Sequence, residues 1–492
     1  MSMRNILVVT GKMAFETVKG YVGGLADVVM GDVDVAALIT PRILRDLLKG
    51  LDLSKYDLIL LPGNVSSDFD QLEEEFGVRI RLGPRNAHDL PHILKKIDEI
   101  ELSKRKPACS FLEPDHEQIQ RELLELEERS VPAFTIDRVK IGGSSSMKVM
   151  AEVVDATGLD DDKLRERVRY FAHEGADIID LGVGLDATRD DVARAVRVAA
   201  SATDLPLSID TMDPELIRAG VDAGARLVLS LDSDNIGEVG GYLANKDVSV
   251  VVLSRNGTDE LLETIKTAKS VGIKKIIADP VLAPLGHGTV RSICECWKFR
   301  AYDPGTPLFF GVGNVTELLD ADSIGVNALL AGIGMELGVS ILFTPEASRK
   351  TAGSVRELVK ASRMMRLASK RQTSPKDLGI DLFVAKEKRM REGIPVSDKA
   401  PVKVITEEAK WGSDPLGYFR IGLKDGMIYV EHNTPDGRVD VLAGKSAKEI
   451  VSYLVKDGRI SMIDHGAYLG VELAKAELAL RFKRSYVQDE EI

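Results

Sequence analysis

The chain has 492 residues, of which 44% are hydrophobic and 29% charged, a composition typical of soluble globular protein with two to four domains. Its net charge of −12 argues against a general nucleic-acid or anionic-membrane binder, because both need a basic surface. Three cysteines without framework spacing fit a reducing cytosol. The start "MSMRNILVVTG" lacks a signal-peptide pattern, and no apolar run approaches the ~18 residues of a membrane span. We expect a cytoplasmic protein with no nucleic-acid or membrane partner.

Strand-like and helix-like runs alternate over residues 1–112. "NILVVTG" and "YDLILLPGN" are buried-strand runs, "DVDVAALIT" is a shorter one, and "AFETVKGYVGGL" is helical in period. The pattern predicts a small doubly wound α/β domain of Rossmann or flavodoxin type. Gly11-Lys12 lacks the other residues of a phosphate loop, so we expect a structural or docking role there. Residues 113–131 are charged and helical in period, which predicts a linker helix.

Residues 132–372 contain eight apolar strand runs with helical segments between them. The polar residues near the ends of these runs are Asp155, Asp180, Asp210, Asp232, Arg255, Asp279, Asn314 and Glu346. They are spaced about 22 to 35 residues apart, and one βα unit needs about thirty. Eight such units predict an α/β fold of the (β/α)8 TIM-barrel type, closed by the helix "ASRKTAGSVRELVKASRMMRLASKR".

The chain changes character after the barrel. Residues 373–400 are polar and predict a linker. Residues 401–492 predict a small α+β domain, with a β-meander turning at "KDG" and "TPDG" and then two helices. In "DHGAYLG", Asp464 and His465 are adjacent, whereas a cobalamin-binding signature separates them by one residue. We therefore interpret His465 as a hydrogen-bonding residue at a helix start.

Two strand-end carboxylates stand out. The carboxyl ends of barrel strands form the rim that holds the active site, and Asp210 and Asp279 end the third and sixth strands on opposite sides of the mouth. Both can accept charge-assisted hydrogen bonds from the amidine-like N–H groups of one ligand. The alternative for Asp210 is a helix N-cap, in competition with Thr211 and Asp213 just before Pro214.

Four segments carry a family resemblance. They are "EGADIIDLGVGLDATRDD", "LPLSIDTMDPELIRAGVDAGARLVLSLDS", "IIADPVLAP" and "PLFFGVGNVTELL". In this order they resemble the pterin-binding barrel family, which includes dihydropteroate synthase and cobalamin-dependent methyltransferases that use methylated folates. With its flanking regions, the chain resembles the dihydropteroate synthase-like group associated with tetrahydromethanopterin-using archaea and methylotrophs. The resemblance implies a reduced pterin, of tetrahydromethanopterin or folate type, as ligand or substrate.

The resemblance also implies residue roles. Asp210 and Asp279 would hold the amino-pyrimidinone edge of the pterin, and Asn314 would lie near its N5. The other residues expected to bind substrate are Asp180, Thr188, Arg189, Ser230 and Arg255. Thr188 and Arg189 match a turn that contacts pyrophosphate, although a surface helix start explains them equally well. Asp155 falls near a residue linked to metal, so it would hold Mg²⁺, a cation that prefers oxygen ligands.

Two departures from the synthases leave the reaction open. Thr344-Pro345-Glu346 replaces an Arg-x-His of strand eight, and "VVDATGLDDD" replaces an anion-binding loop. The first hypothesis is a transferase that joins a pterin methyl diphosphate to an arylamine, with Arg189 and either Arg255 or Lys350 neutralising the diphosphate. The second is methyl transfer at N5 with a corrinoid protein as partner, and the third is a non-catalytic pterin binder. Pairing through outer helices, frequent in this family, suggests a homodimer. No strand ends in the lysine of an aldolase-like enzyme.

Overall fold

The computed structural model describes residues 5–111, 116–384, 405 and 412–490. The chain divides into two compact units. The first contains residues 1–133, 142–147 and 362–381, and the second contains residues 134–141, 148–361 and 382–492. The second half of the predicted linker, residues 385–400, lies outside the described residues.

The first unit contains a parallel sheet of order β2-β1-β3-β4. Its elements are β1 (Ile6–Thr10), α1 (Phe15–Val22), β2 (Asp27–Met30), α2 (Pro41–Leu48), β3 (Leu58–Leu61), α3 (Asp70–Phe76), β4 (Arg79–Leu82) and α4 (Leu90–Lys95). Alternate residues of β1 and β3 face two separate cores. Leu7 and Val9 pack with α2 and α3, whereas Ile6 and Val8 pack with α1 and α4. Helices therefore cover both faces, which confirms the doubly wound prediction.

One predicted strand of this unit is wrong. "DVDVAALIT" contains a short 3-10 helix, Ala36–Leu38, and the strand beside β1 is Asp27–Met30. The carbonyls of Val33 and Asp34 accept hydrogen bonds from the backbone of Lys12 and Met13 instead of joining the sheet. A Cβ on Gly11 would lie 2.7 Å from the Ala36 nitrogen, so Gly11 serves this close backbone approach. The structural interpretation of Gly11-Lys12 is thereby supported.

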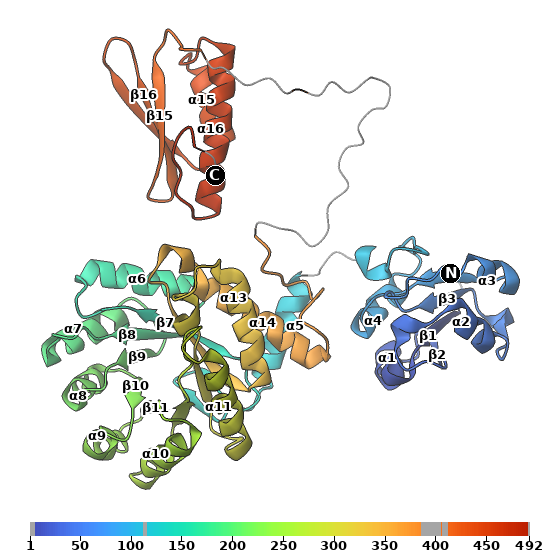
Figure 1. The fold of residues 1–492 in the computed structure, drawn as a ribbon, viewed down its shortest axis with the longest axis horizontal. Coiled ribbons are helices and arrows are strands. Elements are labelled where there is room, and N and C mark those ends of the chain that lie inside the picture. The colour runs from blue at the N-terminus through green and yellow to red at the C-terminus, as the bar shows by residue number, and fades with distance from the viewer. Residues whose placement is uncertain (1–4, 112–115, 385–404, 406–411, 491–492) are drawn as a thin grey trace. The chain divides into compact units, whose positions relative to one another are not determined.

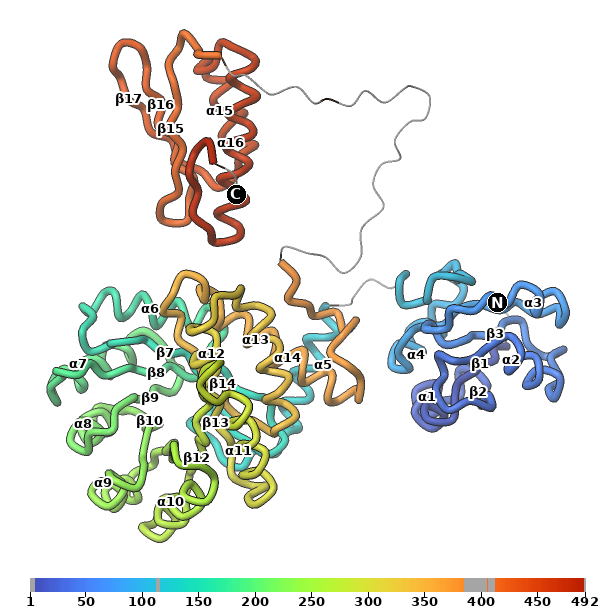
Figure 2. Tube along the Cα trace, viewed as in Figure 1, coloured from blue at the N-terminus to red at the C-terminus, as the bar shows by residue number. Residues whose placement is uncertain are grey.

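The second unit contains a closed barrel of eight parallel strands, β7 to β14 (Figures 1 and 2). The strands are β7 (Lys148–Val153), β8 (Ile178–Gly182), β9 (Leu207–Asp210), β10 (Leu227–Leu231), β11 (Ser249–Leu253), β12 (Ile276–Asp279), β13 (Leu308–Gly311) and β14 (Val339–Pro345). The helices are α6 (Asp161–Glu174), α7 (Arg189–Ala200), α8 (Pro214–Ala223), α9 (Ile236–Leu243), α10 (Thr258–Ser270), α11 (Thr289–Tyr302), α12 (Gly313–Thr316), α13 (Ser323–Glu336) and α14 (Ser354–Arg371). The predicted (β/α)8 barrel is confirmed.

An antiparallel hairpin lies at the amino ends of the barrel strands. It consists of β5 (Phe134–Ile136) and β6 (Val139–Ile141). Ile136 and Ile141 are buried in one core with Met150, Ile178 and Leu227 and with other apolar residues that point into the barrel. The hairpin therefore closes this end of the barrel with apolar side chains, and the opposite end forms the rim.

The remaining elements are a helix in the predicted linker region and the carboxyl-terminal sheet with its two helices. The linker helix is α5 (His116–Glu128). The carboxyl-terminal sheet is antiparallel, with β15 (Tyr418–Lys424), β16 (Met427–Asn433) and β17 (Val439–Gly444). Helices α15 (Ala447–Lys456) and α16 (Ile463–Arg481) pack on one face of it. His465 is buried in the first turn of α16, with Nδ1 3.2 Å from Oδ2 of Asp414. In the described part of the chain, no helix is long and apolar enough to cross a bilayer.

Candidate functional site

Three carboxylates converge inside the barrel near its rim. Glu152, Asp180 and Asp210 lie on the adjacent strands β7, β8 and β9. Strand residues two apart point the same way, so Glu152 follows the inward-facing Met150, and Asp180 follows Ile178. The ladder pairs Met150 with Ile178 and Glu152 with Asp180, so toward the rim an apolar pair is followed by an acidic pair. We call Glu152, Asp180 and Asp210 together the acidic layer. One carboxylate oxygen from each of the three residues lies within 4.8 Å of the other two.

Burial dominates the electrostatics of this acidic layer. Asp180 has no solvent exposure, and neither of its carboxylate oxygens has a hydrogen-bond partner. Burial, and then the charges of Asp210 and Glu152, raise the pKa of Asp180 well above its usual value. The Ser208 hydroxyl lies near enough to lower that pKa somewhat, but it forms no hydrogen bond of normal geometry. Burial also raises the pKa of Glu152 to about 7 and that of Asp210 to about 6.

Asp279 ends β12 in a similarly buried position. Its Oδ1 accepts a hydrogen bond from the Val281 N–H at 2.8 Å. Burial raises the pKa of Asp279 to about 7, although the Val281 hydrogen bond and the positive charge of Arg255 oppose the shift. Arg255 itself is exposed, just after β11. The two predicted carboxylates, Asp210 and Asp279, therefore both lie at strand ends in environments that penalise their charged forms.

Asp210 does not cap a helix. The N-cap of α8 is Asp213, whose Oδ1 accepts from the backbone N–H groups of Glu215 and Leu216. Pro214 follows at the first helical position, as expected for a residue without an N–H group. The Asp210 carboxylate is therefore not needed to cap α8, and it belongs to the acidic layer.

Asn314 and Ser230 lie on other parts of the rim. Asn314 lies just after β13, in the short helix α12. Its Nδ2 donates a hydrogen bond to the Leu282 carbonyl at 2.9 Å. It therefore holds the loop that follows Asp279. Ser230 is buried on β10, next to β9, after a cis peptide bond. Its carbonyl accepts a hydrogen bond from Asn235, at 3.2 Å.

Three other predicted site residues are not brought into the acidic layer. Thr188 is the N-cap of α7 and forms a capping box with Asp191. Arg189 is more than half exposed and forms an ion pair with Glu215 at 2.5 Å. Asp155 is exposed and lies outside the group of carboxylates close enough to share an ion. The structure favours the surface-helix interpretation of Thr188 and Arg189.

The strand-eight departure has a structural explanation. Glu346 accepts hydrogen bonds from the Tyr170 hydroxyl at 2.8 Å and from the Val355 N–H at 3.1 Å. It therefore connects α6 with the first turn of α14. Nearby, Lys350 donates to the Leu319 carbonyl and lies 3.5 Å from an oxygen of Asp320. The basic residue proposed there for a diphosphate is already engaged with protein oxygens.

Glu152 is a site residue that the sequence reasoning missed. It stands inside "MKVMAEVVD", and the strand-end position was assigned to Asp155 instead. A signal was available, because a charged residue in the middle of an apolar parallel strand contradicts burial on both faces. Glu152 also has the same parity as Met150, so a strand register with Met150 inward predicts an inward carboxylate.

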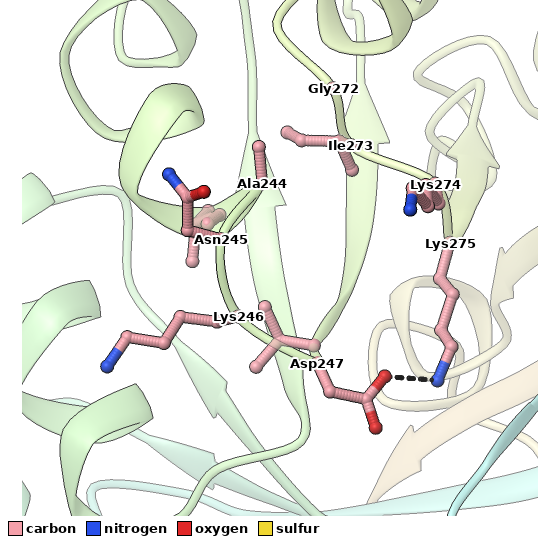
Figure 3. A pocket seen from close by; sticks show the side chains of 10 residues that line it. Ala244, Asn245, Lys246, Asp247, Gly272, Ile273, Lys274 and Lys275 are labelled. Atoms are coloured by element: carbon pink, nitrogen blue, oxygen red, sulfur yellow. Dashed lines mark hydrogen bonds and ion pairs between the residues drawn. The ribbon is translucent and has the colours of Figure 1, made fainter.

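Two hollows lie elsewhere. One, of about 270 Å³, lies at the amino ends of β11 and β12, where Asp247 and Lys275 form an ion pair at 2.7 Å (Figure 3). That end of a barrel serves stability rather than catalysis. The other, of about 720 Å³, lies in the first unit near the carboxyl ends of β3 and β4. Two of its basic residues are ion-paired, Arg81 with Glu73 and Lys104 with Asp70, each at 2.6 Å.

Two family models match parts of the chain. The model described as PterinBD-DUF4346 matches residues 413–489, and that of the CO dehydrogenase/acetyl-CoA synthase delta subunit matches residues 142–302. The barrel and these matches define a dihydropteroate synthase-like protein of the pterin-binding barrel class. The chain belongs to the same family as Uncharacterized protein MJ0107 of Methanocaldococcus jannaschii, to which it is 37% identical over 516 residues and 98% of both chains.

Other similarities are more partial. The Ycf91-like protein of Nostoc sp. is 34% identical over 123 residues, which cover 19% of this chain and 97% of that protein. Among solved structures, 7,8-dihydropteroate synthase from Vibrio fischeri is 19% identical, with a TM-score of 0.39, over 48% of this chain and 95% of that one. Dihydropteroate synthase from Xanthomonas albilineans in complex with 7,8-dihydropteroate is 21% identical, with a TM-score of 0.37 and the same coverage.

Proposed function

We propose that the barrel binds a reduced pterin at its rim and acts as a transferase in methanopterin- or folate-type one-carbon metabolism. The observation that carries this proposal is the pair of buried strand-end carboxylates, Asp210 and Asp279, neither of which forms an ion pair within the described residues. The amino-pyrimidinone edge of a pterin presents N–H donors, and a carboxylate accepts such hydrogen bonds strongly in a buried site.

The raised pKa values of these carboxylates support a ligand role. Burial disfavours the charged forms, so a ligand that donates hydrogen bonds to the charged forms recovers part of that free energy. Groups with perturbed pKa values in a cleft are frequent at functional sites. Asn314, which holds the loop after Asp279, would lie beside the same ligand.

Pterin binding is tested directly by calorimetric titration of the full chain with tetrahydromethanopterin-type and folate-type pterins. We expect Asp210→Asn and Asp279→Asn each to weaken binding by about 2 kcal/mol or more, the scale of a hydrogen bond to a charged group. Asp232→Asn is the matched control. Asp232 also ends a strand, but its Oδ1 accepts backbone hydrogen bonds from Asp234 and Asn235 in a turn. Equal pterin affinity in all four proteins would refute the site.

Between the two transfer reactions, the arrangement of basic residues favours methyl transfer at N5 over displacement of pyrophosphate. A diphosphate needs cations for charge neutralisation. Arg189 is paired with Glu215, Lys350 is engaged with Leu319 and Asp320, and Arg255 is the remaining candidate of the three. A methyl group on N5 carries no such requirement. Its acceptor would be a corrinoid protein partner, and a family match to the CO dehydrogenase/acetyl-CoA synthase delta subunit supports one-carbon chemistry.

The two reactions give different products. We expect N5-methyl pterin to lose its methyl group when the chain is mixed with a reduced corrinoid protein, and we expect no pyrophosphate from a pterin methyl diphosphate and an arylamine. Pyrophosphate release that depends on Asp210 would contradict the preference for methyl transfer and establish the synthase reaction. Tight pterin binding without either product would leave a non-catalytic binder.

A further inference from the structure

The acidic layer contains more carboxylates than a planar pterin edge needs. Within the described residues, Glu152, Asp180 and Asp210 form no ion pair, and neither oxygen of Asp180 has a hydrogen-bond partner of normal geometry. Buried charges without partners are costly, so such groups are neutralised by protons, by a cation or by a ligand. The geometry of the layer distinguishes among these three.

We propose that Glu152, Asp180 and Asp210 bind one hard divalent cation, Mg²⁺ or Mn²⁺, inside the barrel near its rim. Their carboxylate oxygens lie within 4.8 Å of one another, a spacing that one ion with metal–oxygen distances of about 2.0–2.6 Å can span. All three ligands are oxygen atoms, and carboxylates suit such cations.

The hydroxyl of Ser208 is a separate observation that points to a ligand. Ser208 lies on β9 in register with Asp180, so its side chain faces the same interior. It has no solvent exposure, and its Oγ has no hydrogen-bond partner. One proton shared between two carboxylates satisfies few of these oxygens, whereas an ion held by all three carboxylates contacts each of them and leaves an Asp180 oxygen to accept from the Ser208 hydroxyl.

Room for the ion comes from Gly182. This residue follows Asp180 by two positions on β8 and pairs with Asp210 in the barrel ladder. A Cβ there would lie 3.1 Å from Oε1 of Glu152. The missing side chain therefore leaves space beside the Glu152 carboxylate, on the strand between Glu152 and Asp210. Asp180 itself is too buried to reach the edge of a pterin-sized ligand, but a single ion can contact it.

This site differs from the expectation for Asp155. Asp155 is exposed on the loop after β7 and lies outside the acidic layer. The proposed ion lies deeper, where Asp210 can direct one oxygen to the ion and the other to the pterin. Its charge is balanced by three carboxylates, so it does not supply the cation that a diphosphate would need. The proposal shares Asp210 with the proposed function, but metal binding can be measured without any pterin.

The test uses the full chain, stripped of metal by a chelator and then titrated with Mn²⁺ alone, with free Mn²⁺ followed by electron paramagnetic resonance. We expect one ion per chain. Asp180→Asn should weaken binding by about 100-fold or more, since even the loss of an outer partner of a metal ligand costs 10–100-fold. Asp232→Asn, a strand-end carboxylate outside the layer that closes a turn, should bind Mn²⁺ as the wild type does.

Glu152→Gln provides a second variant at a less buried position, in case Asp180→Asn does not fold. Absence of Mn²⁺ binding at millimolar metal would overturn the proposal, as would equal affinity in the wild type and either layer variant. Thermal stabilisation of both variants in chelator, without any effect of Mn²⁺ on the wild type, would show that the layer holds protons only. Pterin titration in chelator is a separate measurement, so loss of Mn²⁺ binding is distinguishable from loss of pterin binding.

Discussion

Replacing Asp279 with Asn should stabilise the ligand-free barrel while it weakens pterin binding. Burial raises the pKa of Asp279 from 3.8 to about 7. A carboxyl whose pKa is raised in the folded state binds more protons folded than unfolded between these values, so stability falls as pH rises through that window. At 1.36 kcal/mol per pKa unit the full penalty is about 4 kcal/mol above pH 7. Asn keeps an oxygen for the Val281 N–H and carries no charge.

About 2.5 kcal/mol of that penalty develops between about pH 5 and pH 8, because the folded carboxyl is still mostly protonated at the lower value. For a unit of barrel size, 1 kcal/mol corresponds to about 2–4 °C in Tm. Differential scanning calorimetry should therefore show the variant gaining roughly 5–10 °C over the wild type at about pH 8 relative to about pH 5. Asp232→Asn, whose carboxylate closes an exposed turn, should show no such pH-dependent gain. A pH-independent difference between Asp279→Asn and the wild type would refute the reasoning.

Three further outcomes follow from the site. Pterin affinity should rise from about pH 5 to above pH 7 as Asp210 and Asp279 ionise, and an affinity constant over that range would contradict carboxylate recognition. Asn314→Ala should weaken pterin binding about tenfold by releasing the loop after Asp279, whereas Asn245→Ala, which breaks a helix-end bond to Gly241, should leave binding unchanged. Thr188→Ala should cost about 1 kcal/mol in unfolding free energy, measured in urea, without changing pterin affinity; a change in affinity would restore its predicted contact role.

The barrel was predictable because its signal is repeated. Eight apolar runs at the pitch of a βα unit specify one architecture, and Asp210 and Asp279 follow from the strand ends. Side-chain roles on the rim were harder to predict. Thr188 and Arg189 matched a contact turn, yet local capping and an ion pair with Glu215 account for them.

Glu152 was missed for a different reason. Its role depends on which parity of β7 faces inward. The charge inside the run marks an unusual position, but the packing of Met150 in the barrel core is what shows that this parity faces inward. The misassigned strand at "DVDVAALIT" has a similar origin. Its alternation is strand-like, but β1 pairs with Asp27–Met30, and the choice between two adjacent apolar runs is made by tertiary contacts.

The β5–β6 hairpin covers one end of the barrel with apolar side chains. Because Ile136 and Ile141 belong to a packed apolar core at the far end, we expect water and ions to approach the acidic layer from the rim. A pterin seated at the rim would also act as a lid over this layer. An ion bound deeper than the pterin would therefore enter before the pterin and leave after it. The geometry of the barrel, without any mobile loop, would set this order of binding.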